Sequence, residues 1–318
     1  MLSEIYHNKL AISMKSLYQP FRYAQKKSQS FPLIFSLICS NFTYVKSSRS
    51  FPASHPKRSL GQNFLVNPNT ARWIVRQLEV SPGDHVIEIG PGKGILTRAF
   101  LETGARITAI EKDTSLCEYL KQELRSPLLT ILEGDATDFP WQTLTDEENP
   151  AILAGNLPYN VSTQILRNLL PRTKIFKKWQ FLFQKEVAER ICANVGTAAY
   201  GALSVFVQSV TRPSLIRIFP PRFFSPPPKI ESALVAFEMR PLSPPTPMQN
   251  KDFIRLVKAA FSHRRKMLRN NLKSLFGRDA DTLESALASL GLTGTLRAQN
   301  LTVEDYLKLA AMLTADLP

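Results

Sequence analysis

The ten residues HVIEIGPGKG at positions 85–94 decide the fold. The first five form a short, mostly apolar run of the kind that builds a buried strand, and a helical pattern begins at residue 95. Glycines between a strand and a helix allow the backbone to turn sharply and to approach a ligand closely. The spacing is G-x-G-x-G rather than the dinucleotide fingerprint G-x-G-x-x-G, so this loop alone does not identify a ligand.

Strands and helices alternate after this loop, and a hairpin follows them. The pattern predicts strands over 85–89, 106–110, 128–132, 151–154 and 179–183, and helices over 95–103, 114–125, 162–170 and 184–194. Such alternation is typical of a doubly wound, Rossmann-like α/β fold, whose parallel sheet binds ligands at the carboxyl ends of its strands. Near 214–238 the rhythm changes, and runs at 215–219 and 233–238 around a Pro-rich turn predict a closing antiparallel hairpin.

The sequence pattern divides the chain into four parts. Residues 1–50 are basic and rich in Ser, and we expect a disordered extension there. Residues 51–240 hold the α/β pattern, and residues 241–250 form a Pro-rich linker. Residues 251–318 have the periodicity of amphipathic helices, which predicts a small all-α C-terminal domain.

The composition limits the classes of function. The chain has 318 residues, a formal net charge of +14 and 44% apolar residues, enough for a folded core. The positive charge favours a polyanionic partner, either a nucleic acid or an anionic membrane surface. No apolar run approaches the roughly 18–20 residues that span a bilayer. The three cysteines form no C-x-x-C pair, which argues against a disulfide framework or a zinc site and favours a reducing compartment.

The N-terminal extension has more than one interpretation. Residues 1–58 hold nine Lys and Arg against one acid, Glu4. A basic, acid-poor, Ser-rich segment is typical of an organelle transit peptide, and Lys26-Lys27 before the apolar run 31–39 faintly resembles a secretory signal. We favour a poorly ordered extension, or upstream sequence included by a wrong start, and therefore expect cytoplasmic localisation with an organelle as the alternative.

Two acids follow the next expected strands. Glu111 ends the second strand, where a carboxylate can accept both hydroxyls of a ribose, and Asp135 follows the third, where it can face the amine of an adenine. Each acid taken alone could be a helix N-cap or a solvated charge. Because they share one edge of the sheet with the Gly loop, the three features predict a slot for an adenosine-containing ligand. The absence of a Walker pattern disfavours a triphosphate.

The segment GNLPYN at 155–160 follows the fourth expected strand. Asn and Pro are common in turns, so a plain turn is one interpretation. Next to an adenosine slot a second applies, because an aromatic amine is a poor nucleophile whose lone pair is delocalised into the ring. The Asn156 side-chain oxygen and a backbone carbonyl next to Pro158 could accept the hydrogens of such an amine, and Tyr159 could stack on a flipped or single-stranded base.

Four motifs occur in order: GQNFL (61–65), EIGPGKG (88–94), NLPYN (156–160) and FSPPPKIES (224–232). Over about residues 57–316 the chain resembles the KsgA/RsmA family of S-adenosylmethionine-dependent rRNA adenine dimethyltransferases. The resemblance implies a methyltransferase domain at 51–240, S-adenosyl-L-methionine as cofactor and no metal. It also implies dimethylation of the N6 amines of two adjacent adenosines in the 3′-terminal hairpin loop of small-subunit (16S) rRNA, in ribosome biogenesis. The implied partner is the immature small subunit, and a monomer is the default expectation.

The resemblance also implies roles for single residues. The cofactor-binding residues would be Asn63, Leu65, Gly90, Glu111, Asp135 and Asn156. The catalytic residues would be Asn156, Leu157, Pro158, Tyr159 and Phe224, with Phe224 packed against the target base opposite Tyr159. Phe224 has a plain alternative, which is a place in the apolar core of the hairpin.

A basic segment at 261–273 is the expected RNA contact. It holds five Arg and Lys between positions 264 and 273 and no acid, and we expect a dense basic helix. The expected RNA-binding residues are Arg264, Arg265, Lys266, Arg269 and Lys273, with Lys57, Arg58 and Lys185 nearby. The plain alternative is a solvated charged face.

Two other functions remain open on sequence grounds. One is an erythromycin-resistance-type methyltransferase that modifies an adenine of large-subunit rRNA. The other is a non-catalytic RNA-binding or transcription accessory protein on the same fold, which a cleaved transit peptide would favour. The intact Gly loop, both acids and Asn156 argue against loss of the cofactor.

Overall fold

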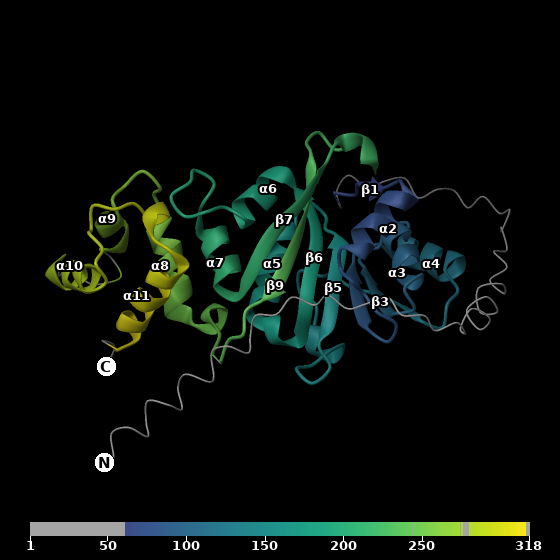
Figure 1. The fold of residues 1–318 in the computed structure, drawn as a ribbon, viewed down its shortest axis with the longest axis horizontal. Helices are drawn as coiled ribbons and strands as arrows, with labels where there is room; N and C mark the ends of the chain where they lie inside the picture. Colours follow the sequence, from purple (N-terminus) through teal and green to yellow (C-terminus); the bar gives the residue numbers. More distant parts are fainter. Residues whose placement is uncertain (1–60, 244, 274, 276–279, 316–318) are drawn as a thin grey trace, which may run out of the picture. The chain divides into compact units, whose positions relative to one another are not determined.

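The computed structural model describes residues 61–243, 245–273, 275 and 280–315. The extension predicted at 1–50 and the basic pair Lys57-Arg58 lie outside the described residues. A mixed seven-stranded sheet in the order β4-β3-β2-β5-β6-β9-β7 is the main feature of the described part (Figure 1).

The sheet has a parallel part and an antiparallel part. The parallel strands are β2 (His85–Ile89), β3 (Arg106–Glu111), β4 (Leu129–Glu133), β5 (Ala151–Asn156) and β6 (Phe176–Gln184). The strand β9 (Ser232–Met239) runs antiparallel between β6 and β7 (Thr211–Phe219). The predicted doubly wound sheet and its closing hairpin are therefore confirmed.

A second, two-stranded sheet was not expected from the sequence. It pairs β1 (Phe64–Leu65) with β8 (Phe224–Ser225) in antiparallel register. Two motifs far apart in the chain, GQNFL and FSPPPKIES, therefore lie side by side.

Helices connect and cover the strands. Those of the α/β part are α2 (Pro68–Arg76), α3 (Ile95–Leu101), α4 (Thr114–Glu123), α5 (Ser162–Leu169), α6 (Lys185–Ile191) and α7 (Ala202–Val210). The later helices are α8 (Lys251–Ala260), α9 (Leu268–Leu272), α10 (Ala280–Ser289) and α11 (Val303–Ala315). Short 3₁₀ turns are η2 (Trp141–Thr143), η3 (Leu170–Ile175), η4 (Pro221–Phe223), η5 (Pro247–Gln249) and η6 (Ala298–Asn300). The sequence pattern gave no expectation for α2 or α7.

Local chemistry explains where these elements begin. The side chain of Asn67 accepts a hydrogen bond from the Thr70 N–H, and Pro68 occupies the first turn of α2, which together start that helix. The Asp113 side chain caps α4 in the same way through the Ser115 N–H. The strand β2 is almost entirely buried because both faces of the sheet are covered there, with Ile87 and Ile89 in one apolar cluster and Val86 in another, which accounts for its continuous apolar run.

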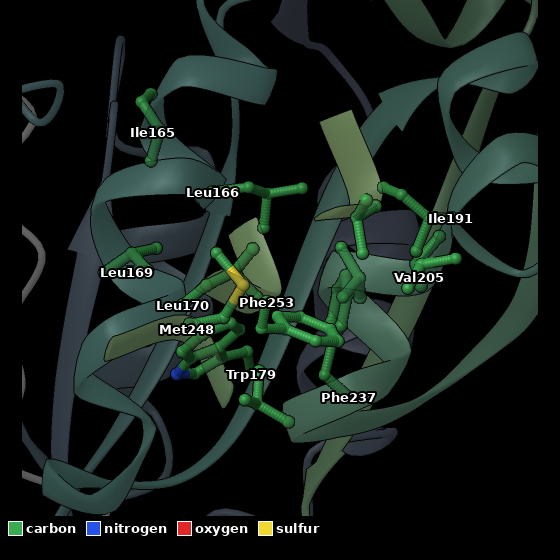
Figure 2. Packing of buried hydrophobic residues seen from close by; sticks show 14 of the residues in the cluster. Ile165, Leu166, Leu169, Leu170, Trp179, Ile191, Val205, Phe237, Met248 and Phe253 are labelled. Carbon is green, nitrogen blue, oxygen red and sulfur yellow. The ribbon is translucent and has the colours of Figure 1, made fainter. Parts of the chain in front are cut away.

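The apolar core continues from the sheet into the C-terminal helices. Figure 2 shows Met248 and Phe253 among side chains of α5 and β6, including Leu166 and Trp179, and these residues belong to one buried cluster. The ring of Phe253 also packs edge-on against Phe206 of α7. The domain boundary at 241–250 stays a prediction, but helix α8 beyond it is anchored in the core of the α/β part.

The basic helix predicted over 261–273 is wrong. Helix α8 ends at Ala260, residues 261–267 form turns, and α9 begins only at Leu268. The Asn271 side-chain amide donates hydrogen bonds to the carbonyls of Ala260 (2.7 Å) and His263 (3.1 Å). These bonds hold the end of α8 against α9, so the chain turns back instead of continuing as one helix.

Candidate active site

A cavity lies at the carboxyl ends of the parallel strands. The strand order β3-β2-β5 reverses between β2 and β5, the position at which doubly wound sheets bind ligands. Predicted site residues that line the cavity are Asn63, Gly90, Glu111, Asp135, Asn156, Leu157, Pro158 and Tyr159. The structure therefore brings together all of the predicted cofactor and catalytic residues except Leu65 and Phe224.

Glu111 organises the wall formed by the Gly loop. One carboxylate oxygen accepts a hydrogen bond from the Gly92 N–H (3.1 Å), and the other accepts from the Asp113 N–H (3.0 Å). Burial raises the pKa of Glu111, while these backbone hydrogen bonds oppose the rise. Each oxygen keeps a second lone pair, so the carboxylate can also accept from a pair of ribose hydroxyls.

Gly92 leaves room for the ring of Phe64 at the cavity wall. Its φ of +58° favours glycine, and a Cβ there would lie 2.7 Å from a ring carbon of Phe64. The Lys93 ammonium lies 5.4 Å from the centroid of the same ring. Phe64 itself lines the cavity, and no role was predicted for it. A two-residue strand has no periodicity from which the sequence could show that Phe64 faces the cavity.

Asp135 is held at the far end of the cavity. Its carboxylate accepts hydrogen bonds from Lys112 Nζ (2.6 Å) and from the backbone N–H (2.9 Å) and hydroxyl (2.7 Å) of Thr137. Partial burial raises the pKa of Asp135, but these hydrogen bonds outweigh it and leave the pKa below its ordinary value. Asp135 is therefore an ionised acceptor at neutral pH.

Asn156 presents a buried oxygen without a partner. Its amide nitrogen donates to the Asn63 carbonyl (2.6 Å), which fixes the orientation of the amide because a carbonyl requires a donor. The Oδ1 atom is buried and has no hydrogen-bond partner among the described residues. A buried unpaired acceptor is costly unless a ligand satisfies it, so this atom is the strongest indication of a bound donor.

The backbone beside Asn156 offers a second acceptor. The Pro158 carbonyl accepts from the Val161 N–H (3.2 Å). Within the described residues, no donor bonds the carbonyl of Leu157, which precedes it. Of the two carbonyls next to the Leu157-Pro158 bond, that of Leu157 has the greater capacity to accept from a ligand.

Tyr159, which lines the cavity, is held in place by a residue of β9. Its hydroxyl shares a short hydrogen bond with the Ser232 hydroxyl, and Ser232 is fully buried. Burial raises the pKa of Tyr159, and the bond to Ser232 opposes that rise. Ser232 was quoted in the FSPPPKIES motif but had no predicted role, and the structure places it behind the proposed stacking residue.

Leu65 and Phe224 lie together but outside the cavity. They are register partners in the β1–β8 sheet, and both are buried in an apolar cluster with residues of α2 and α3. Phe224 therefore occupies a core position, which was the alternative to a catalytic role. Its contact with a target base stays a prediction.

Glu88 is a buried acid with no predicted role, although an acid within an apolar strand run was a signal present in the sequence. It is fully buried in β2, and neither of its oxygens has a hydrogen bond of normal geometry. Burial raises the pKa of Glu88 to about 8, while nearby Thr97 lowers it and the charge of Glu111 raises it. Glu88 is therefore mostly protonated at neutral pH and carries no charge beneath the Gly loop.

The geometry agrees with comparisons to known proteins. Residues 53–315 match the family described as "Ribosomal RNA adenine dimethylase". The chain belongs to the ribosomal RNA adenine dimethylase family. A ribosomal RNA small subunit methyltransferase A from Phenylobacterium zucineum is 42% identical over 255 residues, which are 80% of this chain and 87% of the relative. The relative of the same name from Alcanivorax borkumensis is 38% identical, covering 80% and 89%.

A solved member of similar function supports the dimethylase assignment. The crystal structure of a dimethyladenosine transferase from Plasmodium falciparum is 25% identical to this chain, with a TM-score of 0.68. The likeness covers 79% of this chain and 98% of that structure. The cofactor of the dimethylase family is S-adenosylmethionine. The cavity fits it, with a carboxylate for a ribose, an acceptor for an adenine amine, and a glycine, Gly92, that leaves space for the cavity-lining ring of Phe64.

The basic residues predicted to bind RNA in this dimethylase are not equivalent. Arg264 donates to the carbonyls of Ala198 (2.6 Å) and Tyr200 (2.9 Å). Arg269 lies 3.7 Å from Glu284, and Lys185 forms an ion pair with Glu231 at 2.8 Å. Within the described residues, no hydrogen bond or ion pair engages the side chains of Arg265, Lys266 or Lys273, which are exposed.

The described residues were also compared with the requirements of a membrane-spanning helix and of a metal site. None of their helices has the length and apolar character to cross a membrane. No group of three or more His, Cys, Asp or Glu in the described ranges is arranged to hold a metal ion.

Proposed function

We propose that this protein transfers methyl groups from S-adenosylmethionine to the N6 amines of two adjacent adenosines in the 3′-terminal hairpin loop of small-subunit rRNA. Asn156 carries the proposal, because its buried Oδ1 atom has no partner and lies in a cavity that also holds Glu111 and Asp135. Family membership and curated small-subunit relatives at about 40% identity support the same activity.

The residues of the chain activate the amine by accepting its hydrogens. Asn156 Oδ1 accepts a hydrogen bond from one N–H of the amine, and the Leu157 carbonyl accepts from the other. These two bonds localise the nitrogen lone pair toward the methyl donor. The bond from Asn156 Nδ2 to the Asn63 carbonyl keeps the acceptor oxygen directed away from the 61–65 segment. S-Adenosylmethionine supplies an already activated sulfonium methyl group. No strong base is required, because the nitrogen loses its proton only after its positive charge has developed.

Tyr159 holds the target base in our proposal. An adenine must leave its stack to reach the cavity, and an aromatic ring at the rim compensates for the lost stacking. The bond to Ser232 fixes the ring and limits the conformational entropy that binding would remove.

The decisive experiment follows methyl label. Purified protein is incubated with labelled S-adenosylmethionine and immature small ribosomal subunits, and the rRNA is digested to nucleosides. We expect label in N6-dimethyladenosine from the small-subunit rRNA. Label confined to large-subunit rRNA would assign the erythromycin-resistance type instead. RNA binding without any label would assign a non-catalytic accessory protein.

The proposed function also suggests a binding partner and a cellular compartment. We infer that the immature small subunit is the partner and that Arg265, Lys266 and Lys273 contact its phosphates, since no described residue engages their charges. Arg264 and Arg269 belong to the same proposed surface but also make contacts within the protein. We propose a cytoplasmic monomer, with an organelle as the setting if residues 1–50 are a transit peptide.

A further inference from the structure

Two arginines, one in β7 and one in the turn η4 that follows it, lie over aromatic rings. The Arg217 guanidinium carbon lies 5.0 Å from the Trp73 ring centroid and 5.5 Å from that of Phe219. The Arg222 guanidinium carbon lies 5.6 Å from the Phe223 centroid. The rings are themselves in contact, with centroids 6.1 Å apart for Trp73 and Phe219 and 5.6 Å apart for Phe219 and Phe223. These five residues form one row, which we call the arginine–aromatic row.

Stacking leaves both guanidinium groups available to a ligand. Arg217 and Arg222 are exposed, and among the described residues neither side chain has a hydrogen bond or ion pair. Nearby Arg72, in contrast, is neutralised by Glu102 at 2.8 Å. Contact with a ring face uses none of the N–H groups of a guanidinium, so both arginines keep their donors for an anion. Phosphate oxygens are the partners that such a planar fork binds best.

The arginine–aromatic row is connected to the wall of the cavity on two sides. The Phe223 carbonyl accepts from the Val66 N–H (3.0 Å), next to the β1–β8 sheet that contains the cavity residue Phe64. Phe219 is the register partner of Ser232, whose hydroxyl bonds Tyr159. Figure 1 shows the end of the β7–β9 hairpin close to β1. A strand whose base stacks on Tyr159 would therefore pass the row within a few nucleotides.

We infer that Arg217 and Arg222 bind backbone phosphates of the RNA strand that delivers the target adenosine. The inference rests on the proposed function and adds to it a second RNA contact, on a different element from the basic turn at 261–267. RNA is favoured over a protein partner because the two cations match phosphates, and the partly exposed rings of Trp73 and Phe223 beside them match the exposed bases of a hairpin loop.

The test compares two double variants. Arg217→Gln with Arg222→Gln removes the two charges of the row. Lys121→Gln with Arg125→Gln removes two exposed charges from the end of α4, beside the opposite edge of the sheet. The probe is a labelled RNA hairpin with two adjacent adenosines in its loop, titrated at several salt concentrations, and then the immature small subunit. Affinity for S-adenosylmethionine, measured by calorimetry, checks that each variant is folded.

We expect the row variant to bind the hairpin on the order of tenfold more weakly at about 0.1 M salt, with a salt slope lower by about 1.4, since each phosphate contact contributes about 0.7 on a single strand. The control should match the wild type. Equal affinities and slopes for both variants would overturn the inference. So would unchanged binding to the hairpin with weakened binding to the subunit, because a ribosomal protein would then be the partner. If the wild type methylates no RNA but the row variant still loses RNA affinity, the proposed function is wrong, and the inference that Arg217 and Arg222 bind RNA is supported.

Discussion

Asn156 is the residue on which the proposed chemistry depends most directly. We expect Asn156→Ala to lower kcat by about 10²–10³-fold, because a preorganised partner for the reacting group is lost. RNA affinity should stay near that of the wild type, since the amide is not part of a phosphate-binding surface. Single-turnover methylation and RNA titrations measure the two effects. Asn69→Ala, at an exposed amide on α2, is the control. Equal losses of turnover and affinity would make Asn156 a purely structural residue.

Glu88 makes stability depend on pH in an unusual direction. Its pKa rises from 4.5 to about 8 in the folded protein, so the folded state holds a proton that the unfolded state releases between these values. The free energy of unfolding therefore falls as pH rises through this window. Glu88→Gln keeps a neutral group there and should be more stable than the wild type at pH 8–9, by about 4–5 kcal/mol, with a much smaller difference near pH 5.

Chemical denaturation at several pH values measures the Glu88 effect. Glu118→Gln, at an exposed acid of α4, provides the control. If the wild type and Glu88→Gln show parallel pH profiles, another group is responsible for any pH dependence. A neutral Glu88 also explains why the buried acid is tolerated next to Glu111, because two adjacent buried charges would repel each other.

Elements that sequence could predict are those whose signal lies within the element. The apolar runs of β2, β3 and β5 and the glycines after β2 located the sheet and the cavity edge. The β1–β8 pair depends on contacts between segments about 160 residues apart, and two-residue strands have no periodicity to detect. The prediction of a helix over the basic segment 261–273 was wrong for a related reason. Its composition suits a helix, but the hydrogen bonds from Asn271 to the end of α8 are tertiary contacts.

The contact between the Gly loop and β1 leads to a prediction about cofactor affinity. Gly92→Ala should raise the Kd for S-adenosylmethionine at least tenfold, because its Cβ would displace Phe64 from the cavity wall. Gly83→Ala is a matched control, since Gly83 also has a positive φ (+89°) but a Cβ there would meet nothing within 4 Å. We expect Gly83→Ala to cost about 1 kcal/mol of stability without altering affinity for the cofactor. Similar affinities for both variants would show that Phe64 does not shape the cofactor site.

Across the whole described part, one apolar cluster joins the sheet to the C-terminal helices. The turn at 261–267 is thereby held at a defined position, and Arg264 adds two hydrogen bonds to the segment that precedes α7. Sequence alone placed Arg264, Arg265 and Lys266 in one class, because charge and spacing do not show which cation is already satisfied. The structure separates a residue that fixes the turn from two that extend from it.

Because Arg264 is bonded within the protein and Arg265 and Lys266 extend from the turn, we expect variants of these two groups to affect RNA binding and stability differently. Arg265→Gln with Lys266→Gln should weaken RNA binding and lower the salt slope by about 1.4, because two unengaged charges are removed, with the melting temperature unchanged. Arg264→Gln should lower the melting temperature by a few °C, because the hydrogen bonds to Ala198 and Tyr200 are lost, and weaken RNA binding with a smaller change of slope. RNA titrations at several salt concentrations and thermal unfolding distinguish them. If Arg264→Gln gives the larger loss of slope at unchanged stability, Arg264 is itself the phosphate contact, and RNA binding must break its bonds to the two carbonyls.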